Sequence, residues 1–301
     1  MTPTPPPAPT IAVFTKNRIN PAYVAARLAA DRVASRAGAR TVHYVPETPD
    51  HVGQQKALVR QALAARVDAV LLNPADDVAL QEDLASLVSA GIPVGLFINR
   101  MPGKALTFVG ADDRAVGATA AAALFTGMGG KGTVVGLEGR ASVPTSRARV
   151  LGLRETLTRF PGIELLELAV GDLLQAPAQT AMATLLAKHP RIDGVWTAND
   201  LMALGALDAL GNARRTAKVV GINGLPAAIQ CIEQGTMLAS VDFSAFNIAA
   251  VATEAMLRHL AGKKVPAEIL TPAALIDRTN CAHWKVPFET RPLPVWDEMV
   301  R

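Results

Sequence analysis

The amino-acid sequence predicts an α/β protein of two Rossmann-like lobes, each a parallel sheet flanked by helices, joined by a hinge of several chain segments. Short apolar runs alternate with segments of helical periodicity from residue 11 to about residue 276, which is typical of βαβ units. The 301 residues exceed what one small core usually absorbs. The segment 191–200 (RIDGVWTAND) also resembles 66–76 (RVDAVLLNPAD), and this echo indicates two similar lobes.

The junction after the first strand explains why a ligand site is expected. The apolar run 11–14 is typical of a buried parallel strand, and polar residues occupy 15–17. Asn20 is placed to cap a helix and Pro21 to begin it, and Gly38 ends the helical pattern. In an open α/β sheet, ligands bind beyond the carboxyl ends of the strands, so we expect a ligand crevice here.

The same alternation accounts for most of the remaining chain. In the first lobe we expect further strands at 41–45, 67–72, 92–98 and 106–109, with helices at 50–65 and 78–90. An alanine-rich helix then runs from about Arg114 to Phe125. In the second lobe we expect strands at 133–138, 165–170, 192–197 and 218–222, and helices at 146–160, 177–188, 201–210 and 225–234. Short connections of this kind require parallel strands and right-handed crossovers.

The last part of the chain departs from the alternation, with a strand at 237–243, a helix at 247–260 and an extended stretch at 269–276. We interpret these pieces as a return to the first lobe and back, so two or three crossings form the hinge. The expected division is a disordered proline-rich tail at 1–10, an N-terminal lobe of 11–109 plus 243–273, and a C-terminal lobe of 110–242 plus 274–301.

Composition and motifs exclude several classes of protein. The net charge of +4 comes without a dense basic block, so we expect no nucleic-acid partner. The glycine-rich segment 127–133 precedes a strand and has a glycine after its lysine, which rules out a P-loop. Neither a nucleophile elbow nor a metal-type spacing of Cys and His occurs. We therefore expect no catalysis, no metal and no cofactor, while Cys231 and Cys281 fit either a disulfide or two free thiols.

Targeting signals leave the cellular compartment open at this point. No apolar run reaches the roughly 20 residues that span a bilayer, and no signal peptide pattern is present. The sequence therefore fits either a cytoplasmic protein or a mature exported protein whose signal has been removed.

A set of motifs in a particular order resembles the type I periplasmic sugar-binding proteins, in a layout similar to ribose-binding proteins of ABC importers. The resemblance covers about residues 11–276. Its motifs are NPAY at 20–23, LNP at 72–74, AGIPV at 90–94, NR at 99–100, GKGTVV at 130–135, LEG at 137–139, SRAR at 146–149, ANDLMALGA at 198–206 and VGIN at 220–223. The resemblance implies a ligand held between two closing lobes, a periplasmic location, a membrane ABC permease as partner, and a monomer.

The resemblance also implies which residues contact the ligand. They are Asn20, Tyr23, Asn99, Arg100, Arg147, Asn199 and Asn223, followed by the segment around Asp242 and Phe243; Lys16 and Asn17 form an extra polar pair in the first loop. Asn side chains donate and accept, and Arg offers a planar fork of donors, which suits a ligand ringed by hydroxyls. Aromatic rings of Tyr23 or Phe243 can cover the apolar C–H faces of a sugar.

Departures from the ribose-binding pattern narrow the ligand. Those relatives carry Asp where this chain has Asn99 and Asn223, and aromatic residues where it has Ala22 and, nearby, Leu173. With fewer rings to stack on, we expect a linear polyol or an unusual monosaccharide first. An acidic sugar is the second expectation, because Lys16 and the two arginines are near the expected site.

One alternative class shares the expected fold. Sugar-responsive transcriptional regulators of the LacI type have the same two lobes behind an N-terminal helix-turn-helix module of about 60 residues. In this sequence the first strand begins by Ile11, so the alternative is the effector-binding part of such a regulator without its DNA-binding module.

Overall fold

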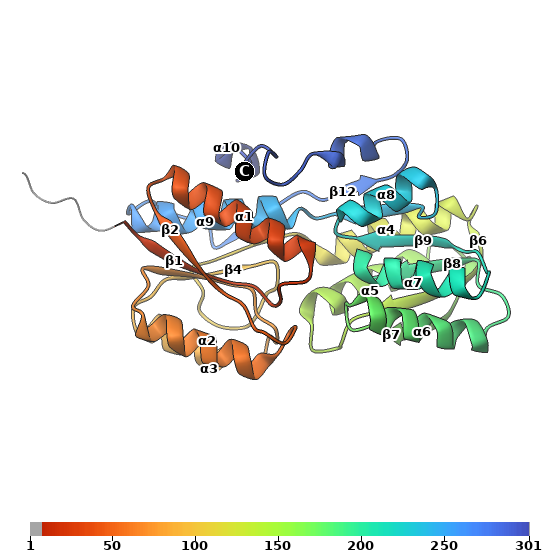
Figure 1. Ribbon diagram of the computed structural model, residues 1–301, viewed down its shortest axis with the longest axis horizontal. Coiled ribbons are helices and arrows are strands. Elements are labelled where there is room, and N and C mark those ends of the chain that lie inside the picture. The colour runs from red at the N-terminus through yellow and green to blue at the C-terminus, as the bar shows by residue number, and fades with distance from the viewer. Residues whose placement is uncertain (1–7, 301) are drawn as a thin grey trace, which may run out of the picture. The chain divides into compact units, whose positions relative to one another are not determined.

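A computed structural model describes residues 8–300 and divides the chain into two compact units (Figure 1). Unit 1 comprises the described residues up to Gly110, together with Ala245–Thr271 and the segment from Phe288 onward. Unit 2 comprises Ala111–Ser244 and Pro272–Pro287. Residues 1–7 of the expected tail lie outside the described residues. Within 8–300, no helix is long and apolar enough to cross a membrane.

Unit 1 contains a six-stranded sheet in the order β11-β5-β4-β3-β1-β2, in which all paired strands are parallel. Its strands are β1 (Thr10–Phe14), β2 (Arg40–Tyr44), β3 (Ala69–Leu72), β4 (Val94–Phe97), β5 (Thr107–Gly110) and β11 (Glu268–Leu270). The strands β1, β3, β4 and β5 are buried along their whole length. Burial on both faces explains why these strands are continuous apolar runs rather than alternating ones.

Helices cover both faces of the unit 1 sheet (Figure 1). They are α1 (Pro21–Arg36) and α9 (Ala245–Leu260) on one face, and α2 (Val52–Ala64) and α3 (Gln81–Ser89) on the other. The buried side of α1 consists mostly of alanines, so α9 can pack closely against it. The opposite face holds a core of Val, Leu and Phe side chains that includes Phe14, Leu72 and Leu84.

Unit 2 contains a second six-stranded sheet in the order β12-β10-β9-β8-β6-β7. Its strands are β6 (Lys131–Glu138), β7 (Gly162–Val170), β8 (Gly194–Thr197), β9 (Lys218–Ile222), β10 (Ala239–Asp242) and β12 (Ala274–Ile276). Only β12 runs antiparallel, beside β10. The helices of unit 2 are α4 (Asp113–Gly127), α5 (Pro144–Leu157), α6 (Gln175–Lys188), α7 (Asp200–Asn212) and α8 (Pro226–Gln234).

The C-terminal part of the chain differs from the sequence prediction. The extended stretch 269–276 is two strands, with β11 at the edge of the unit 1 sheet and β12 in unit 2. The segment 288–301 was assigned to the C-terminal lobe, but Phe288 stacks on Phe246 of α9, which places its described part in unit 1. The chain therefore passes between the units four times, at 110/111, 244/245, 271/272 and 287/288, instead of two or three times. No periodicity marks 288–300, so the sequence pattern did not indicate this return.

Two glycines set the distance between α4 and α5. A Cβ at Gly152 would lie 2.0 Å from the carbonyl oxygen of Arg114, and one at Gly117 would lie 2.2 Å from the carbonyl oxygen of Arg149. Both obstacles are backbone atoms, which cannot rotate away as a side chain can. The close approach fixes the position of α5, the helix that carries Arg147 and Arg149.

We therefore expect Gly152→Ala to lower the free energy of unfolding by about 1–3 kcal/mol through overpacking. Gly211→Ala is the matched control, because Gly211 lies in α7 and a Cβ there meets nothing within 4 Å. The control should be neutral or stabilising by up to about 1 kcal/mol. Urea unfolding of both variants measures the difference, and equal stabilities would contradict the close helix contact.

Candidate functional site

Strained backbone marks the carboxyl ends of several strands in both units. Ile98 follows β4 with a φ of 63°, Asn223 follows β9 with a φ of 132°, and Ser244 follows β10 with a φ of 53°. Residues with a Cβ rarely adopt such angles, and they persist where the surrounding structure holds them, often at binding sites. The expected ligand residues Asn99, Asn223 and Phe243 are at or next to these positions, and Asp242 is two residues before Ser244. We describe the two ends separately as the unit 1 half-site and the unit 2 half-site.

The unit 1 half-site consists of Lys16, Asn17, Asn20, Tyr23, Asn73 and Asn99. Its first loop is shaped by the amide of Asn17, which donates to Asp50 Oδ1 (3.0 Å) and accepts from the Asn20 backbone N–H (2.9 Å). Asn20 in turn caps α1 by accepting from the N–H of Ala22 (3.0 Å), as the sequence predicted. These bonds fix the turn from strand to helix.

Lys16 brings a positive charge to the unit 1 half-site, and the ring of Tyr23 lies near it. Lys16 is only 1% exposed, and its Nζ lies 5.9 Å from the centre of the Tyr23 ring. Burial raises the pKa of the Tyr23 hydroxyl, the Asp50 carboxylate adds to the rise, and the Lys16 ammonium opposes it. The phenol is therefore neutral at physiological pH and keeps its proton for hydrogen bonding.

Two buried amides complete the unit 1 half-site. Asn73 and Asn99 are 0% and 1% exposed, and Asn99 donates from Nδ2 to the carbonyl of Pro74 (3.1 Å). The Oδ1 of Asn99 finds no hydrogen-bond partner among residues 8–300. The Asn73 amide interacts with the Tyr23 hydroxyl and lowers its pKa. Asn73 is not among the ligand contacts that the resemblance implies.

Arg100 is engaged elsewhere. Its guanidinium pairs with Glu268 of the edge strand β11 and lies 3.8 Å from the centre of the Phe108 ring. The side chain is exposed and covers the edge of the sheet. The structure thus shows Arg100 in a role at the sheet edge, whereas the resemblance implied a ligand contact.

The unit 2 half-site contains Arg147, Arg149, Asn199, Asn223, Asp242 and Phe243. Asn223 donates its backbone N–H to the carbonyl of Val241 (2.9 Å), so the ends of β9 and β10 meet. A Cβ at Gly224, whose φ is 64°, would lie 2.9 Å from the Cβ of Asp242, so only glycine leaves room there. The Oδ1 of Asn223 has no hydrogen-bond partner within residues 8–300.

Arg149 links several elements of this half-site, and the resemblance did not include it among the ligand contacts. Arg149 is 4% exposed, its Nε donates to Asp113 Oδ1 (2.9 Å), and its Nη1 donates to the carbonyl of Ala198 (2.7 Å). Its guanidinium carbon lies 5.0 Å from the centre of the Phe243 ring. Arg147 is exposed and donates to the carbonyl of Ala141 (2.6 Å). Because the two arginines are two residues apart on one helix, their side chains point in directions that differ by about 200° around the helix axis.

Asn199 and Asp200 organise the start of α7. The Asn199 amide caps the helix by accepting from the Met202 N–H (2.8 Å), and it donates to the carbonyl of Leu173 (2.9 Å). Asp200 is fully buried and accepts from the N–H of Leu225 and from the Ser240 hydroxyl. Burial raises the pKa of Asp200 to about 7, with Asp242 adding to the rise. A neutral carboxyl group thus lies beneath the unit 2 half-site at lower pH.

Other chemistry finds little support in the part of the chain that the structure describes. No group of three or more His, Cys, Asp or Glu residues within 8–300 is arranged to hold a metal ion. Cys231 and Cys281 are free thiols, which decides between the two alternatives that the sequence left open.

Comparison with known proteins identifies the family. The sequence pattern of the family described as periplasmic binding protein domain matches residues 11–264. The ribose import binding protein of Bacillus subtilis is 29% identical over 268 residues, which cover 88% of this chain and 86% of that protein. The xylitol-binding protein of Mycolicibacterium smegmatis is 32% identical over 192 residues, which cover 62% of this chain and 54% of that protein.

A solved structure gives the same result. An ABC transporter periplasmic solute binding protein from Actinobacillus succinogenes with bound D-allose has a TM-score of 0.87 and 27% identity, and the match covers 91% of this chain and 99% of that one. The chain belongs to the periplasmic binding protein family and has its type I fold. Its function is that of a solute-binding protein, and the comparisons do not support the regulator alternative. Members of this family bind substrates and are not enzymes.

The raised pKa of Asp200 predicts a pH dependence of stability. The carboxyl group binds its proton more tightly in the folded protein than in the unfolded chain, where its pKa is near 3.8. Its contribution to stability is therefore complete below about pH 4 and is lost as the pH rises toward 7. We expect Asp200→Asn to remove this decline, which amounts to up to about 4 kcal/mol for a shift of three pKa units.

The measurement is urea unfolding of the wild type and the variant at several values between pH 4 and pH 8. Asn keeps the shape of the neutral acid and the acceptor for the Leu225 N–H. If the two stability curves run parallel over this range, Asp200 does not titrate as described.

Proposed function

We propose that this protein is the solute-binding component of an ABC importer, and that it binds a neutral polyhydroxylated solute through both half-sites as its lobes close. A linear polyol or an unusual monosaccharide is the preferred ligand class. The relatives are a ribose import binding protein, a xylitol-binding protein and a solute binding protein with bound D-allose. Their names support this class.

The unsatisfied buried amides carry this proposal. Asn99 in unit 1 and Asn223 in unit 2 each have a buried side-chain atom without a hydrogen-bond partner in residues 8–300. Leaving such an atom unpaired lowers the stability of the folded protein by about 1–3 kcal/mol. Each buried unpaired atom therefore calls for a partner from outside the chain, and a bound ligand is such a partner. Amide groups both donate and accept, and this matches hydroxyl groups, which do the same.

The charges near the half-sites favour a neutral ligand over an acidic sugar. Arg149 is paired with the carboxylate of Asp113, and Arg100 with that of Glu268. The unit 2 half-site also contains the carboxylate of Asp242, which would repel an acid. Lys16 is a buried cation as well, and its ammonium lies 5.9 Å from the centre of the Tyr23 ring.

The aromatic rings favour a linear polyol over a flat ring. Tyr23 lies beside Lys16, and Phe243 faces the guanidinium of Arg149. Leu173, at a position near which ribose-binding relatives carry an aromatic residue, gives its carbonyl to Asn199. A linear polyol offers hydroxyls along its length without requiring a stacking surface on both sides.

The remaining parts of the proposal follow from the same family. The names of the relatives support a periplasmic location and docking of the liganded protein on a membrane permease. Ligand binding selects the closed state, so the permease recognises the loaded protein. We propose a monomer that does not act on nucleic acid and catalyses no reaction.

A thermal-shift screen tests the ligand class. The panel contains xylitol and other linear polyols, D-ribose, D-allose, deoxy sugars and sugar acids. A ligand at 100 times its dissociation constant adds about 2.7 kcal/mol of stability, which raises the Tm of a chain of this size by several degrees. We expect neutral polyols or sugars to give this shift.

Matched variants show whether the shift comes from the proposed site. Asn99→Ala should abolish the shift, and Asn212→Ala, at an exposed position at the end of α7, should leave it unchanged. Shifts with sugar acids alone would reverse the preferred class. No shift with any member of the panel would contradict the proposed function.

The two arginines of α5 should separate binding from stability. We expect Arg147→Ala to abolish binding with little change in unfolding free energy, because this side chain is exposed. Arg149→Ala should lower the unfolding free energy by about 3–5 kcal/mol, because it leaves the carboxylate of Asp113 without its buried partner. Isothermal titration calorimetry and urea unfolding measure the two effects, and unchanged affinity in Arg147→Ala would remove Arg147 from the site.

A further inference from the structure

The C-terminal segment, residues 281–299, lies beyond the family match at 11–264. It starts with the short 3₁₀-helix η1 (Cys281–Lys285) in unit 2 and ends with α10 (Trp296–Met299) in unit 1. The fourth passage between the units, at 287/288, lies inside it. The segment is fixed on both units by specific contacts.

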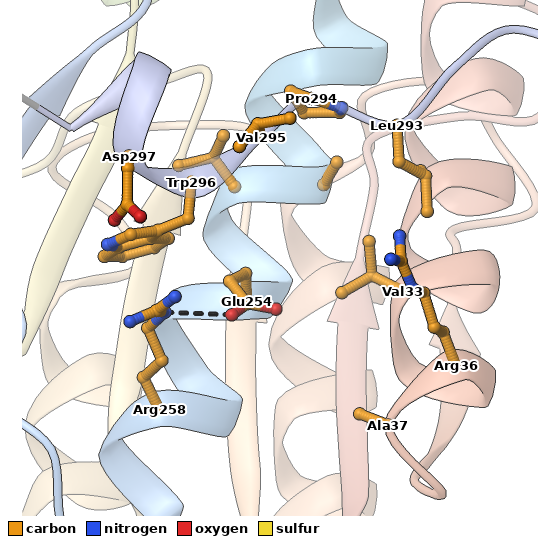
Figure 2. A pocket seen from close by; sticks show the side chains of 12 residues that line it. Val33, Arg36, Ala37, Glu254, Arg258, Leu293, Pro294, Val295, Trp296 and Asp297 are labelled. Atoms are coloured by element: carbon orange, nitrogen blue, oxygen red, sulfur yellow. Dashed lines mark hydrogen bonds and ion pairs between the residues drawn. The ribbon is translucent and has the colours of Figure 1, made fainter.

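On unit 1, aromatic and arginine side chains fix the segment to α1 and α9. Phe288 stacks on Phe246 with ring centres 6.1 Å apart, and Arg32 of α1 donates to the carbonyls of Phe288 (3.0 Å) and Arg291 (2.7 Å). The guanidinium carbon of Arg258, in α9, lies 4.3 Å from the centre of the Trp296 ring, and Arg258 also forms an ion pair with Glu254. Trp296, Arg258 and Glu254 are among the residues that line a cavity of about 440 Å³ beside the segment. Figure 2 shows how these side chains lie around it.

That cavity is not the ligand site of the preceding sections. It is lined by the end of α1, including Val33 and Arg36, whereas Tyr23 lies at the beginning of the same helix. Thirteen residues of α-helix separate Tyr23 from Arg36, which is about 20 Å. The cavity therefore marks where the segment is anchored.

On unit 2, the segment reaches a residue of the half-site. Trp284 donates from its indole Nε1 to Asp242 Oδ2 (2.8 Å). The 3₁₀-helix that carries Trp284 is held by an ion pair between Lys285 and Glu233 of α8 (2.5 Å) and by the buried side chain of Cys281. Trp284 itself is half-buried, and its ring is held by this hydrogen bond to Asp242.

The carboxylate of Asp242 is thus oriented from several sides. Its Oδ1 accepts from the N–H of Ser244 (2.6 Å), its Oδ2 accepts from Trp284, and Gly224 packs against its Cβ. Two hydrogen bonds to different oxygens fix the plane of a carboxylate. Asp242 is 8% exposed, and it lies near the strained residue Asn223, because the Asn223 N–H donates to the carbonyl of Val241 and Gly224 packs against the Asp242 Cβ.

We propose that Trp284 is a positioning residue for ligand binding and acts by orienting the Asp242 carboxylate. This inference rests on the proposed function, in which Asp242 contacts the ligand. A hydrogen bond between a carboxylate and a ligand hydroxyl depends strongly on direction, so a carboxylate free to rotate binds the same hydroxyl less well. The C-terminal segment thereby contributes to the half-site without touching the solute.

A double-mutant cycle tests the proposal by calorimetric titration with xylitol and D-allose. Trp284→Phe keeps an aromatic ring but removes the donor, and we expect its Kd to rise about tenfold, the effect of one hydrogen bond to a charged group. Asp242→Asn should weaken binding at least as much. In the Asp242→Asn background, the further change Trp284→Phe should have almost no effect on Kd, because Trp284 acts through the carboxylate.

The control is Trp296→Ala, a tryptophan of the same segment that contacts Arg258 in unit 1. It should lower the Tm and leave Kd unchanged, so a general loosening of the segment is distinguished from loss of the indole donor. Additive effects of Trp284→Phe and Asp242→Asn, or an equal loss of affinity in Trp296→Ala, would overturn the positioning role. Unchanged affinity in Asp242→Asn would overturn it too, while leaving the proposed function intact. If wild-type protein binds no member of the screened panel, both the proposed function and this role fall.

Discussion

The buried ion pair between Arg149 and Asp113 is the interaction on which the unit 2 half-site depends. One guanidinium links the start of α4, the carboxyl end of β8 through the carbonyl of Ala198, and the ring of Phe243 after β10. A planar group with five donors can make these contacts at once. Because the two charges neutralise each other, Arg149 adds little net positive charge to this half-site.

Both half-sites follow the same physical rule. Parallel strands end in backbone that must turn sharply into a helix, and side-chain amides satisfy that backbone at Asn17, Asn20 and Asn199. Other amides at the same edges, at Asn99 and Asn223, have a buried oxygen without a hydrogen-bond partner in the described residues. One residue type thus caps the helices at these edges and also supplies the amides that we propose for ligand binding.

The fold was predictable from the sequence because the apolar runs of the parallel strands are short, buried and regularly spaced. The positions of Asn20, Asn99 and Asn223 at strand ends also followed from that alternation. The buried position of Arg149 did not, because the sequence does not show which side of α5 packs against α4, where Gly117 and Gly152 bring the two backbones together. The contact between Arg100 and Glu268 could not be predicted either, because Glu268 lies 168 positions away, on a strand too short to show a pattern.

The four passages of the chain between its units have a consequence for how the protein is made. The sheet of unit 1 begins with the first described residues, yet α9, which covers one of its faces, and β11, which completes its edge, come from residues 245–270. A growing chain folds as its segments leave the ribosome, usually one domain at a time from the N-terminus. The lobe that begins first here is completed only after the other, so the nascent protein carries an incomplete N-terminal lobe until residues 245–270 have been synthesised.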